Sequence, residues 1–579
     1  MRAELQDADV ACVGTPPLVC KHNARWGASL PGVDMFRRLA KTAVGVLAIS
    51  ALLPATVFAY SFIYEPYVNN TYTYRINESS FTTNLRGLSV TASQARYWIR
   101  WSLTQWGATS GANIITSEGS TTTLGDAISE CSNRQSYNFI GVINGCESAD
   151  DCTDACRADP DCETTWAITY RWQDAPQLTG RIERAQVCLF GQSANWEIDA
   201  DNFASTEKDL AGVLTHELGH ALGLNDYPST VMQGNTYGHG NTLARIPYGD
   251  DIEGIRAMYG QGTNTLKVAI YDNAGGFTWV NTPGTFAFRR YGATILEHPT
   301  TGTAYVVHSG PSNGGGDLHF RRTPYPVTAA SVWTNKSFSG LGGAWAPPRM
   351  VSNASRTIAV WPKKTPFYSN CSGIMVGSTT AAFDNLNQFV LEDSCTLQPV
   401  SIAWDPTSSR YIMAYARHST SNSVNNRIMI RVSTSSTGFL WGAPQDTTIR
   451  SSLAPSVACS DGECVLTYNH RSIDPFPFHR AFTVNSASNT VSVSAVTTSI
   501  ADRSLAPPSA AGRTTGSDVL LMWSNNNDSD VRFEPASSVP VTFDDQYWPS
   551  SSARYGGEVG VFADPPATNY FPHIFYVLR

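Results

Sequence analysis

The stretch HELGHALGLND, from His216 to Asp226, is the most informative part of the chain. On a helix, His216 and His220 are one turn apart, so both imidazoles project from one face and can bind one metal ion. Glu217 lies beside them and can take a proton from water without being a ligand itself. Gly223 suits the turn that ends the helix, and Asp226 follows as a third ligand. Two nitrogens and one carboxylate oxygen leave a fourth zinc position open, which is typical of catalytic zinc sites.

A five-residue HExxH match alone can arise by chance, so the surrounding residues must also support the helix. They predict an amphipathic helix. Ser205 or Thr206 can cap its start. Apolar side chains follow at helical spacing, at Leu210, Val213, Leu214, Leu218, Ala221 and Leu222. The extended pattern HExxHxxGxxD is far rarer by chance than its core, and it favours a catalytic zinc site.

Residues 205–260 resemble the active-site half of a metzincin metalloprotease, and the matrixin branch in particular. Met232 matches the Met-turn that lies beneath the metal in that clan, and Tyr248 to Gly260 resembles the helix that closes matrixin catalytic domains. The usual third ligand is histidine, whereas this chain has Asp226, as some bacterial metzincin-like proteases do. A carboxylate ligand adds negative charge and should make the zinc a weaker Lewis acid. The cysteine switch and the structural-zinc histidines of matrixins are not visible in the sequence.

Two residues of the next loop are candidates for the substrate pocket. His239 is either a replacement third ligand, a substrate-contacting group or a histidine in the pocket wall. Asp226 has the better claim as ligand, because the motif requires a short reach from the helix end after Gly223. Tyr237 is either an oxyanion-stabilising phenol or a packing residue.

Composition limits the function classes. The chain has 579 residues, too many for one domain, and 42% of them are hydrophobic, enough for ordinary buried cores. The net charge of −8 comes with no basic stripe, so we expect no nucleic-acid partner. We expect a monomer that acts on a protein or peptide substrate. One catalytic Zn²⁺ is implied, and a Ca²⁺ site is not evident.

The first 60 residues indicate export. Met35 begins the expected signal peptide, residues 35–59, whose positive n-region contains Arg37, Arg38 and Lys41. An apolar core follows over residues 42–53, and Val57-Phe58-Ala59 offers a small-residue cleavage site. We expect residues 1–34 to be a mis-assigned extension. The apolar core is too short for a membrane span, so the mature protein should be secreted, to the outside or the periplasm.

Disulfides are the expected state of the cysteines in an oxidising compartment. Of the 12 cysteines, removal of Cys12 and Cys20 with the extension leaves ten. The run from 146 to 162 can be taken for a metal knuckle, but its exported setting favours disulfides. Six cysteines fall in the protease region: Cys131, Cys146, Cys152, Cys156, Cys162 and Cys188. The expected pairs in the second half are Cys371 with Cys395 and Cys459 with Cys464.

Residues 60–263 form the expected metzincin-like α+β domain. Alternation predicts strands at Thr71–Ile76, Trp166–Trp172 and Ile182–Phe190, and helical spacing predicts a helix with Ala95, Trp98, Ile99, Leu103 and Trp106 that ends at Gly107. This order resembles the matrixins, in which a strand before the zinc helix forms the rim where an extended substrate pairs. Ile182–Phe190 is our candidate for that rim.

Residues 264–579 change to short strands with a repeat of about 50 residues. The best-marked strands are Tyr305–His308, Thr357–Trp361, Tyr411–Tyr415, Cys464–Tyr468, Val519–Trp523 and His573–Val577. The first five are each followed by a further strand, at Leu318–Arg321, Ile374–Gly377, Ile428–Val432, Ala481–Val484 and Val531–Phe533. An unpaired strand, Lys267–Tyr271, opens the region. If the first and last strands share one sheet, the ring closes, which predicts a six-bladed β-propeller.

Two hairpins of this region resemble the Asp-box of sialidase-like propellers. Asp272 to Trp279 carries the motif, and Ser435 to Trp441 is a copy without the aspartate. These hairpins are structural, and a platform that binds substrate or cell-surface glycan is the expected role of the propeller.

The sequence thus predicts a secreted zinc endopeptidase in which Glu217 activates water for peptide hydrolysis. The first alternative is a glycan-binding adhesin with a vestigial zinc site, against which the intact Glu217 argues. The second is a glycosidase centred on the propeller.

Overall fold

The structure, a computed structural model, describes most of the two predicted domains. The described residues are 66–109, 112–122, 137–143, 166–173, 181–199, 204, 206–226, 231–232, 245–247, 250–260, 263–271, 277–287, 293–298, 303–309, 318–324, 330–336, 344, 346, 348–353, 355–363, 373–380, 386–419, 426–451, 453–460, 463–470, 476–495, 497–499, 507–512, 519–524, 531–536, 546–547, 561–562 and 573–578. The expected N-terminal extension and signal peptide lie outside them. In the part described, no helix is long and apolar enough to cross a membrane.

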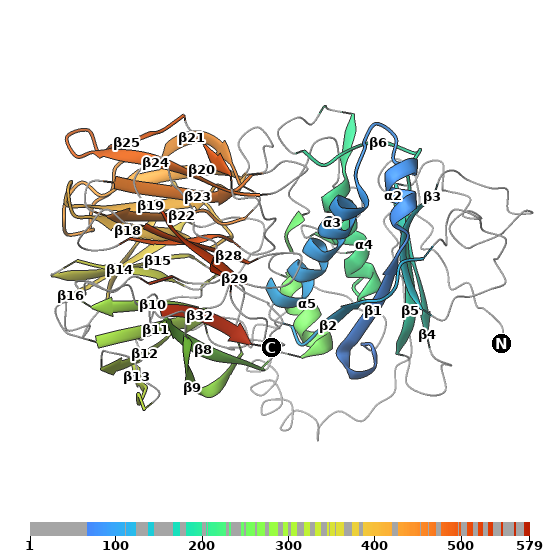
Figure 1. The fold of residues 1–579 in the computed structure, drawn as a ribbon, viewed down its shortest axis with the longest axis horizontal. Helices are drawn as coiled ribbons and strands as arrows, with labels where there is room; N and C mark the ends of the chain where they lie inside the picture. Colours follow the sequence, from blue (N-terminus) through green and yellow to red (C-terminus); the bar gives the residue numbers. More distant parts are fainter. Residues whose placement is uncertain are drawn as a thin grey trace, which may run out of the picture. The chain divides into compact units, whose positions relative to one another are not determined.

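A five-stranded sheet forms the scaffold of the first half (Figure 1). Its strands are β1 (Thr71–Ile76), β2 (Ile115–Glu118), β3 (Asn138–Ile143), β4 (Ala167–Gln173) and β5 (Ile182–Phe190), in the spatial order β2-β1-β3-β5-β4. The first three and β5 run parallel, whereas β4 is antiparallel to β5. The predicted strands at 71–76, 166–172 and 182–190 are therefore confirmed.

The position of β5 corrects the prediction of the rim strand. β5 lies between β3 and β4, so Ile182–Phe190 is not the edge, and the prediction is wrong. Among the described strands, β4 is the edge on that side. Order along the chain does not give order in a sheet, and the run of buried residues at the end of β5 is typical of an internal strand.

Helix α3 (Ala92–Thr104) follows the short helices η1 (Val68–Asn70) and α2 (Glu78–Asn84). A capping box starts α3: the Gln94 amide donates to Thr91 Oγ1 at 3.2 Å, and the Thr91 amide donates to Gln94 Oε1 at 2.7 Å. The α-helix ends at Thr104 and continues as a π-helical segment, η2 (Gln105–Thr109). The predicted end at Gly107 falls inside that segment.

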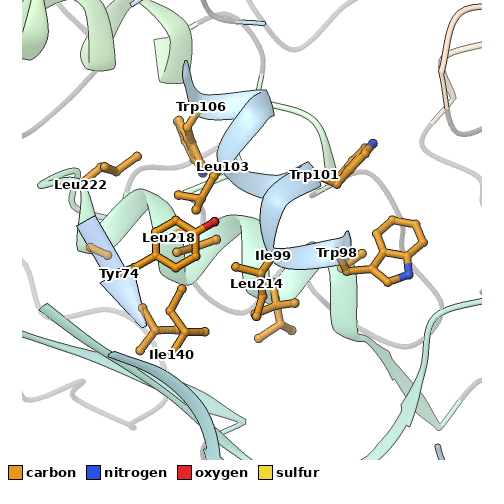
Figure 2. Packing of buried hydrophobic residues seen from close by; sticks show 14 of the residues in the cluster. Tyr74, Trp98, Ile99, Trp101, Leu103, Trp106, Ile140, Leu214, Leu218 and Leu222 are labelled. Atoms are coloured by element: carbon orange, nitrogen blue, oxygen red, sulfur yellow. The ribbon is translucent and has the colours of Figure 1, made fainter. Parts of the chain in front are cut away.

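Apolar side chains of α3 pack against helix α4 (Leu210–Ala221), which carries the histidine motif (Figure 2). Figure 2 shows Trp98, Ile99, Trp101, Leu103, Trp106, Leu214, Leu218, Leu222, Tyr74 and Ile140 in this core. A polar contact joins η2 to α4, since the Trp106 indole donates to the Thr215 carbonyl at 2.6 Å. Burial of each large side chain in this core stabilises the packing of α4 on the sheet by about 1.5–3 kcal/mol.

The start of α4 differs from the prediction. The cap is Asp209, whose carboxylate accepts a hydrogen bond from the Ala211 amide at 3.2 Å. Thr206 lies too early, because the short strand β7 (Glu207–Asp209), paired with β6 (Asn195–Glu197), separates it from the helix, and Ser205 lies outside the described residues.

Asp209 also takes part in a buried ion pair. Its two carboxylate oxygens accept hydrogen bonds from Arg245, each at 2.8 Å, and both side chains are buried. Arg245 donates in addition to the Ile198 carbonyl at 2.6 Å, and its guanidinium lies 5.2 Å from the centre of the Trp98 ring. The pair therefore connects the start of α4 to the segment that precedes α5 (Asp250–Tyr259), the last helix of the first half.

Asp209→Ala should lower the free energy of unfolding by about 3–5 kcal/mol, because it leaves the Arg245 guanidinium buried without its anion. Equilibrium urea unfolding followed by tryptophan fluorescence measures the loss. The matched control is Asp446→Ala, which breaks the half-exposed Arg427–Asp446 pair at 2.9 Å. That change should cost less than about 1 kcal/mol. Equal costs for the two variants would contradict the buried role.

The second half consists of six antiparallel sheets among the residues described. Sheet one holds β10 (Ala293–His298), β11 (Thr303–Ser309), β12 (Leu318–Pro324) and β13 (Thr334–Lys336). Sheet two holds β14 (Arg349–Ser352), β15 (Arg356–Pro362), β16 (Ile374–Thr380) and β17 (Asn387–Leu391). Sheet three holds β18 (Ser401–Asp405), β19 (Arg410–Ala416), β20 (Arg427–Val432) and β21 (Gln445–Arg450).

The fourth sheet holds β22 (Ser456–Ser460), β23 (Glu463–Asn469), β24 (Pro477–Asn485) and β25 (Thr490–Val493), and β26 (Thr498–Ser499) also pairs with β24. The fifth holds β27 (Ser509–Gly512), β28 (Val519–Ser524), β29 (Val531–Ala536) and β30 (Gln546–Tyr547). The sixth combines both ends of this half: β31 (Val561–Phe562), β32 (His573–Leu578), β8 (Thr263–Tyr271) and β9 (Phe277–Ala287). All the strands predicted for this half are therefore confirmed.

The first strands of the six sheets contact one another in a cycle. β10, β14, β18, β22, β27 and β31 follow in that order, and β31 contacts β10 again. Serine hydroxyls link some neighbours, since Ser401 accepts from the Val457 amide at 2.9 Å and Ser456 from the Ala510 amide at 3.1 Å. The predicted pairing of the first and last strands is confirmed, because β32 pairs with β8 from His573 to Leu578.

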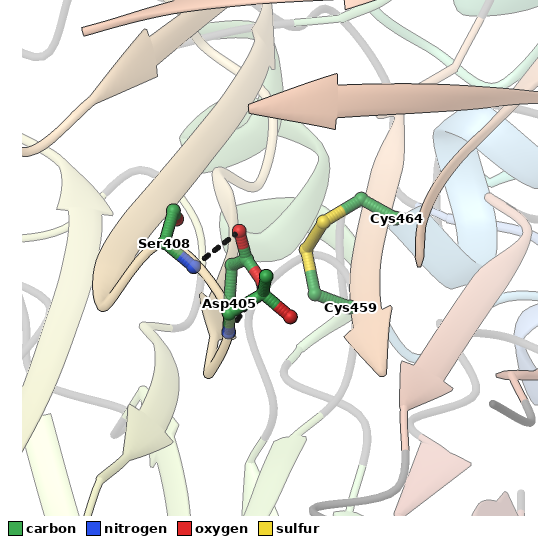
Figure 3. Close-up of a disulfide and its surroundings, with 5 residues drawn as sticks. Asp405, Ser408, Cys459 and Cys464 are labelled. Atoms are coloured by element: carbon green, nitrogen blue, oxygen red, sulfur yellow. Dashed lines mark hydrogen bonds between the residues drawn. A yellow bond between two sulfur atoms is a disulfide. The ribbon is translucent and has the colours of Figure 1, made fainter. Parts of the chain in front are cut away.

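Equivalent hairpins in neighbouring sheets are held in two different ways (Figure 3). Between β18 and β19, the Asp405 carboxylate accepts from the amides of Thr407 at 3.0 Å and Ser408 at 3.2 Å. Between β22 and β23, a disulfide joins Cys459 to Cys464, as predicted.

The described residues include only some of the other cysteines and hairpins for which predictions were made. Cys188 and Cys395 also form disulfides. Cys371 lies outside the described residues, so its pairing with Cys395 stays a prediction. The hairpin from Ser435 to Trp441 is present, with a bridge between Ser433 and Trp441, whereas residues 272–276 of the first Asp-box lie outside the part described.

Candidate metal centre

The end of α4 brings the chain back toward its own histidines. The Gly223 amide donates to the His220 carbonyl at 2.8 Å, and the Leu224 amide donates to the Gly219 carbonyl at 3.0 Å. This is the Schellman arrangement, which needs a left-handed residue, and Gly223 has φ +108°. A Cβ at residue 223 would also lie 2.8 Å from the end of the Met258 side chain, so another residue would be strained at this φ and would have to displace that side chain. The turn delivers Asp226 next to the helix face that carries the two histidines.

The three predicted ligands lie together. His216 Nε2 is 3.4 Å and His220 Nε2 is 3.5 Å from the same oxygen, Oδ1 of Asp226. Among the described residues, this is the one group of three or more His, Cys, Asp or Glu with ligand atoms close together, all within 4.8 Å. Ligands about 2.0–2.1 Å from a tetrahedral zinc are about 3.3 Å apart, so the donor set fits this metal.

Backbone carbonyls orient both imidazoles. His216 Nδ1 lies 2.9 Å from the Val231 carbonyl oxygen, and His220 Nδ1 lies 2.9 Å from the Leu224 carbonyl oxygen. Because a carbonyl only accepts, each Nδ1 donates to it, and the opposite ring nitrogen, Nε2, is directed toward Asp226 Oδ1, where a metal would bind. This arrangement is typical of metal-binding histidines.

Burial and charge favour the metal-binding forms of His216 and Asp226. Burial and the neighbouring His220 lower the pKa of His216 to about 3, so this imidazole is neutral at neutral pH. Burial alone would raise the pKa of Asp226, but the hydrogen bond from His220 and the positive charges around it lower the pKa instead. Burial opposes protonation of His220, but its hydrogen bond with Asp226 and the charge of Glu217 outweigh burial and raise its pKa.

Glu217 lies beside the ligands but does not belong to the ligand group. It is only 6% exposed, and its Oε2 accepts a hydrogen bond from the Thr169 hydroxyl of β4 at 2.6 Å. Burial raises its pKa, which the charge of His220 and the bond from Thr169 oppose. A carboxylate with a raised pKa, fixed by one hydrogen bond, is suited to accept and pass on a proton.

Met232, the residue predicted for a Met-turn, packs against α4. It is 1% exposed, and its Sδ lies 2.3 Å from the position that a Cβ would take at Gly219. The glycine therefore leaves room for the methionine sulfur. The buried Asp251 of α5 holds this turn, since its carboxylate accepts from the amides of Val231 at 2.9 Å and Met232 at 3.4 Å. The same Val231 provides the carbonyl that orients His216, so α5 supports a ligand indirectly.

Sequence reasoning missed three residues at the site: Thr169, Arg171 and Asp251. No local sequence pattern marks Thr169 and Arg171 as site residues, because their partners, Glu217 and residues 224–225, are distant along the chain. Asp251 had such a signal, since it lies in the segment that resembles the closing helix of matrixins. Tyr237 and His239 lie outside the described residues, so their roles stay predictions.

One comparison bears on this part of the chain. Residues 174–260 match the family model described as Matrixin. The match includes α4, Gly223, Asp226, Met232 and α5, and it supports a metallopeptidase-type enzyme. None of the curated proteins compared with the chain matches it.

Solved structures similar to the chain include carbohydrate-active enzymes. One is an exo-β-1,3-galactanase from Phanerochaete chrysosporium, 13% identical, with 50% of this chain and 69% of that chain covered and a TM-score of 0.30. Others are a GH43_1 enzyme from Xanthomonas citri (9% identity, 44% and 89% covered, TM-score 0.29) and a GH43 β-xylosidase/α-arabinofuranosidase from a compost metagenome (12%, 44% and 94%, 0.29). All three TM-scores lie below 0.5.

Proposed function

We propose that the protein is a secreted zinc endopeptidase, with a metzincin-like catalytic domain over residues 60–263. The observation that carries the proposal is the spacing of His216 Nε2 and His220 Nε2 at 3.4 and 3.5 Å from Asp226 Oδ1. His216, His220 and Asp226 would hold a zinc ion at that spacing. Zinc held there would polarise the attacking water and the scissile carbonyl.

The residues around the ligands supply the remaining steps. Glu217 takes the proton from the attacking water and passes it to the leaving amine. The Thr169 hydroxyl, 2.6 Å from Glu217 Oε2, keeps that carboxylate in one orientation. β4 presents a free edge among the described strands, on which an extended substrate can pair as a further strand. β4 therefore takes the role that the sequence had suggested for β5.

We propose in addition that residues 264–579 form a six-bladed β-propeller that binds protein substrate or surface glycan. The cycle of contacts between the first strands and the shared sixth sheet support this architecture. Closing a ring removes the exposed edges that the ends of an open array would have.

The test of the function is hydrolysis of casein by the full chain. We expect activity that is lost on incubation with a zinc chelator and restored by zinc, with one zinc per chain by metal analysis. Hydrolysis of a sialoside and of a β-1,3-galactan, assayed in parallel, is the control and should be absent. Glycan hydrolysis that is insensitive to the chelator, without proteolysis, would refute the proposal.

A further inference from the structure

Strand β4 presents different residues on its two faces. Ile168 and Tyr170 pack with Cys188 and Phe190 of β5 in a small apolar cluster. Thr169 and Arg171 alternate with them, so they project to the opposite face. Both reach the candidate metal centre: Thr169 contacts Glu217, and Arg171 contacts the segment after Gly223.

Arg171 makes two hydrogen bonds to consecutive residues of that segment. Its Nη1 donates to the Leu224 carbonyl at 3.3 Å, and its Nη2 donates to Asn225 Oδ1 at 3.3 Å. The Leu224 carbonyl is also the acceptor for His220 Nδ1 at 2.9 Å. The Arg171 guanidinium therefore binds both the Leu224 carbonyl oxygen, which orients His220, and the side chain of Asn225, the residue next to Asp226.

The third ligand needs such support. The Asp226 side chain is 61% exposed, whereas those of His216 and His220 are 7% and 16% exposed. The histidines are fixed by a buried helix, but Asp226 comes after the Schellman turn has ended. Packing therefore restricts Asp226 least of the three ligands, and hydrogen bonds to its neighbours must do more.

We propose that Arg171 is a positioning residue for zinc, which fixes residues 224–225 so that Asp226 meets the two histidines. This inference rests on the proposed zinc site. It gives the edge strand a second task, because the strand expected to pair with substrate also holds the ligand segment in place. Arg171 acts through its planar fork, whose two nitrogens reach two acceptors at once.

A double-mutant cycle on zinc affinity tests the proposal. Dissociation constants are measured by competition with a chromogenic chelator for the full chain and for Arg171→Met, Asp226→Ala and the double variant. Arg171→Met should weaken binding by about 10–100-fold, the usual effect of a residue that orients a ligand. In the Asp226→Ala background the same change should have a clearly smaller effect, because Asp226 is gone and only the support that the Leu224 carbonyl gives to His220 is then lost.

Two further variants separate positioning from charge and from general stability. Arg171→Lys keeps the charge but lacks the fork, so it should lose most of the affinity that Arg171→Met loses. Arg75→Met is the matched control, since Arg75 is a half-buried arginine on β1 that lies over the Tyr137 ring. It should leave zinc affinity unchanged.

The outcomes are distinct. Equal effects of Arg171→Met in both backgrounds, or full affinity in Arg171→Lys, would overturn the positioning role. Failure of the unaltered chain to bind one zinc would overturn the proposed metal centre instead. Unfolding midpoints of the metal-free variants provide the control for folding, and a drop confined to the zinc-loaded state supports the proposal.

Discussion

Glu217→Gln should remove nearly all peptide hydrolysis and leave zinc bound. Glutamine has almost the same shape and can still accept the hydrogen bond from Thr169, which is 2.6 Å long in the native protein. It cannot take a proton from water at neutral pH. Loss of a general base usually costs about 10²–10⁴-fold in rate, and we expect a loss in that range or above it.

The measurement is kcat and KM on a fluorogenic peptide, with zinc content determined on the same sample. The loss should appear in kcat, because Glu217 acts in the chemical step and not in binding. Glu183→Gln on β5 is the control, since that glutamate is exposed. A Glu217→Gln protein that turns over within tenfold of the native rate would remove Glu217 as the proton acceptor.

Deletion of residues 572–579 should disrupt the second half of the protein. β32 lies between β31 and β8, and its backbone pairs with β8 at six positions, from His573↔Ile270 to Leu578↔Thr265. Without this strand, β31 and β8 both become unpaired edges, and the two ends of the half are no longer joined. Unpaired edges promote association with other chains.

The truncated chain should therefore aggregate on size-exclusion chromatography, or be cleaved by trypsin in its second half under conditions that leave the native protein intact. Removal of Arg579 alone, which is beyond β32, is the matched control and should have no effect. A chain without residues 572–579 that is as soluble and as thermally stable as the native one would point to an open array of sheets.

Features that depend on neighbours close in the sequence, such as ligand spacing on a helix, a glycine turn and short strands, were predicted from sequence patterns. The spacing of His216 and His220 placed two ligands on one helix face, and Gly223 marked the turn that delivers Asp226. The strands of the second half were also predictable, because each sheet repeats the same order of short apolar strands and turns. The pairing of β32 with β8 followed from the unpaired strand at each end.

Features that depend on contacts distant in the chain could not be predicted. Thr169 and Arg171 are polar residues on a half-buried strand, and only the fold brings them to α4. The order of β4 and β5 in the sheet has no local signal, which is why the rim was assigned to the wrong strand. The cap of α4 was misplaced because β7 precedes the helix and leaves Asp209 as its cap.

The shared sixth sheet also constrains how this half can fold. Within this half, β8 and β9 are the first described strands to be synthesised and β32 is the last, so the sheet can be completed only after all the strands between them have been made. Contacts between such distant segments are slow to form, because the chain must first lose the entropy of a long loop. Until then β8 lacks its partner and can pair with another molecule. Completion of this one sheet is therefore the expected rate-limiting step in the folding of this half, and the stage at which it is most exposed to misassembly.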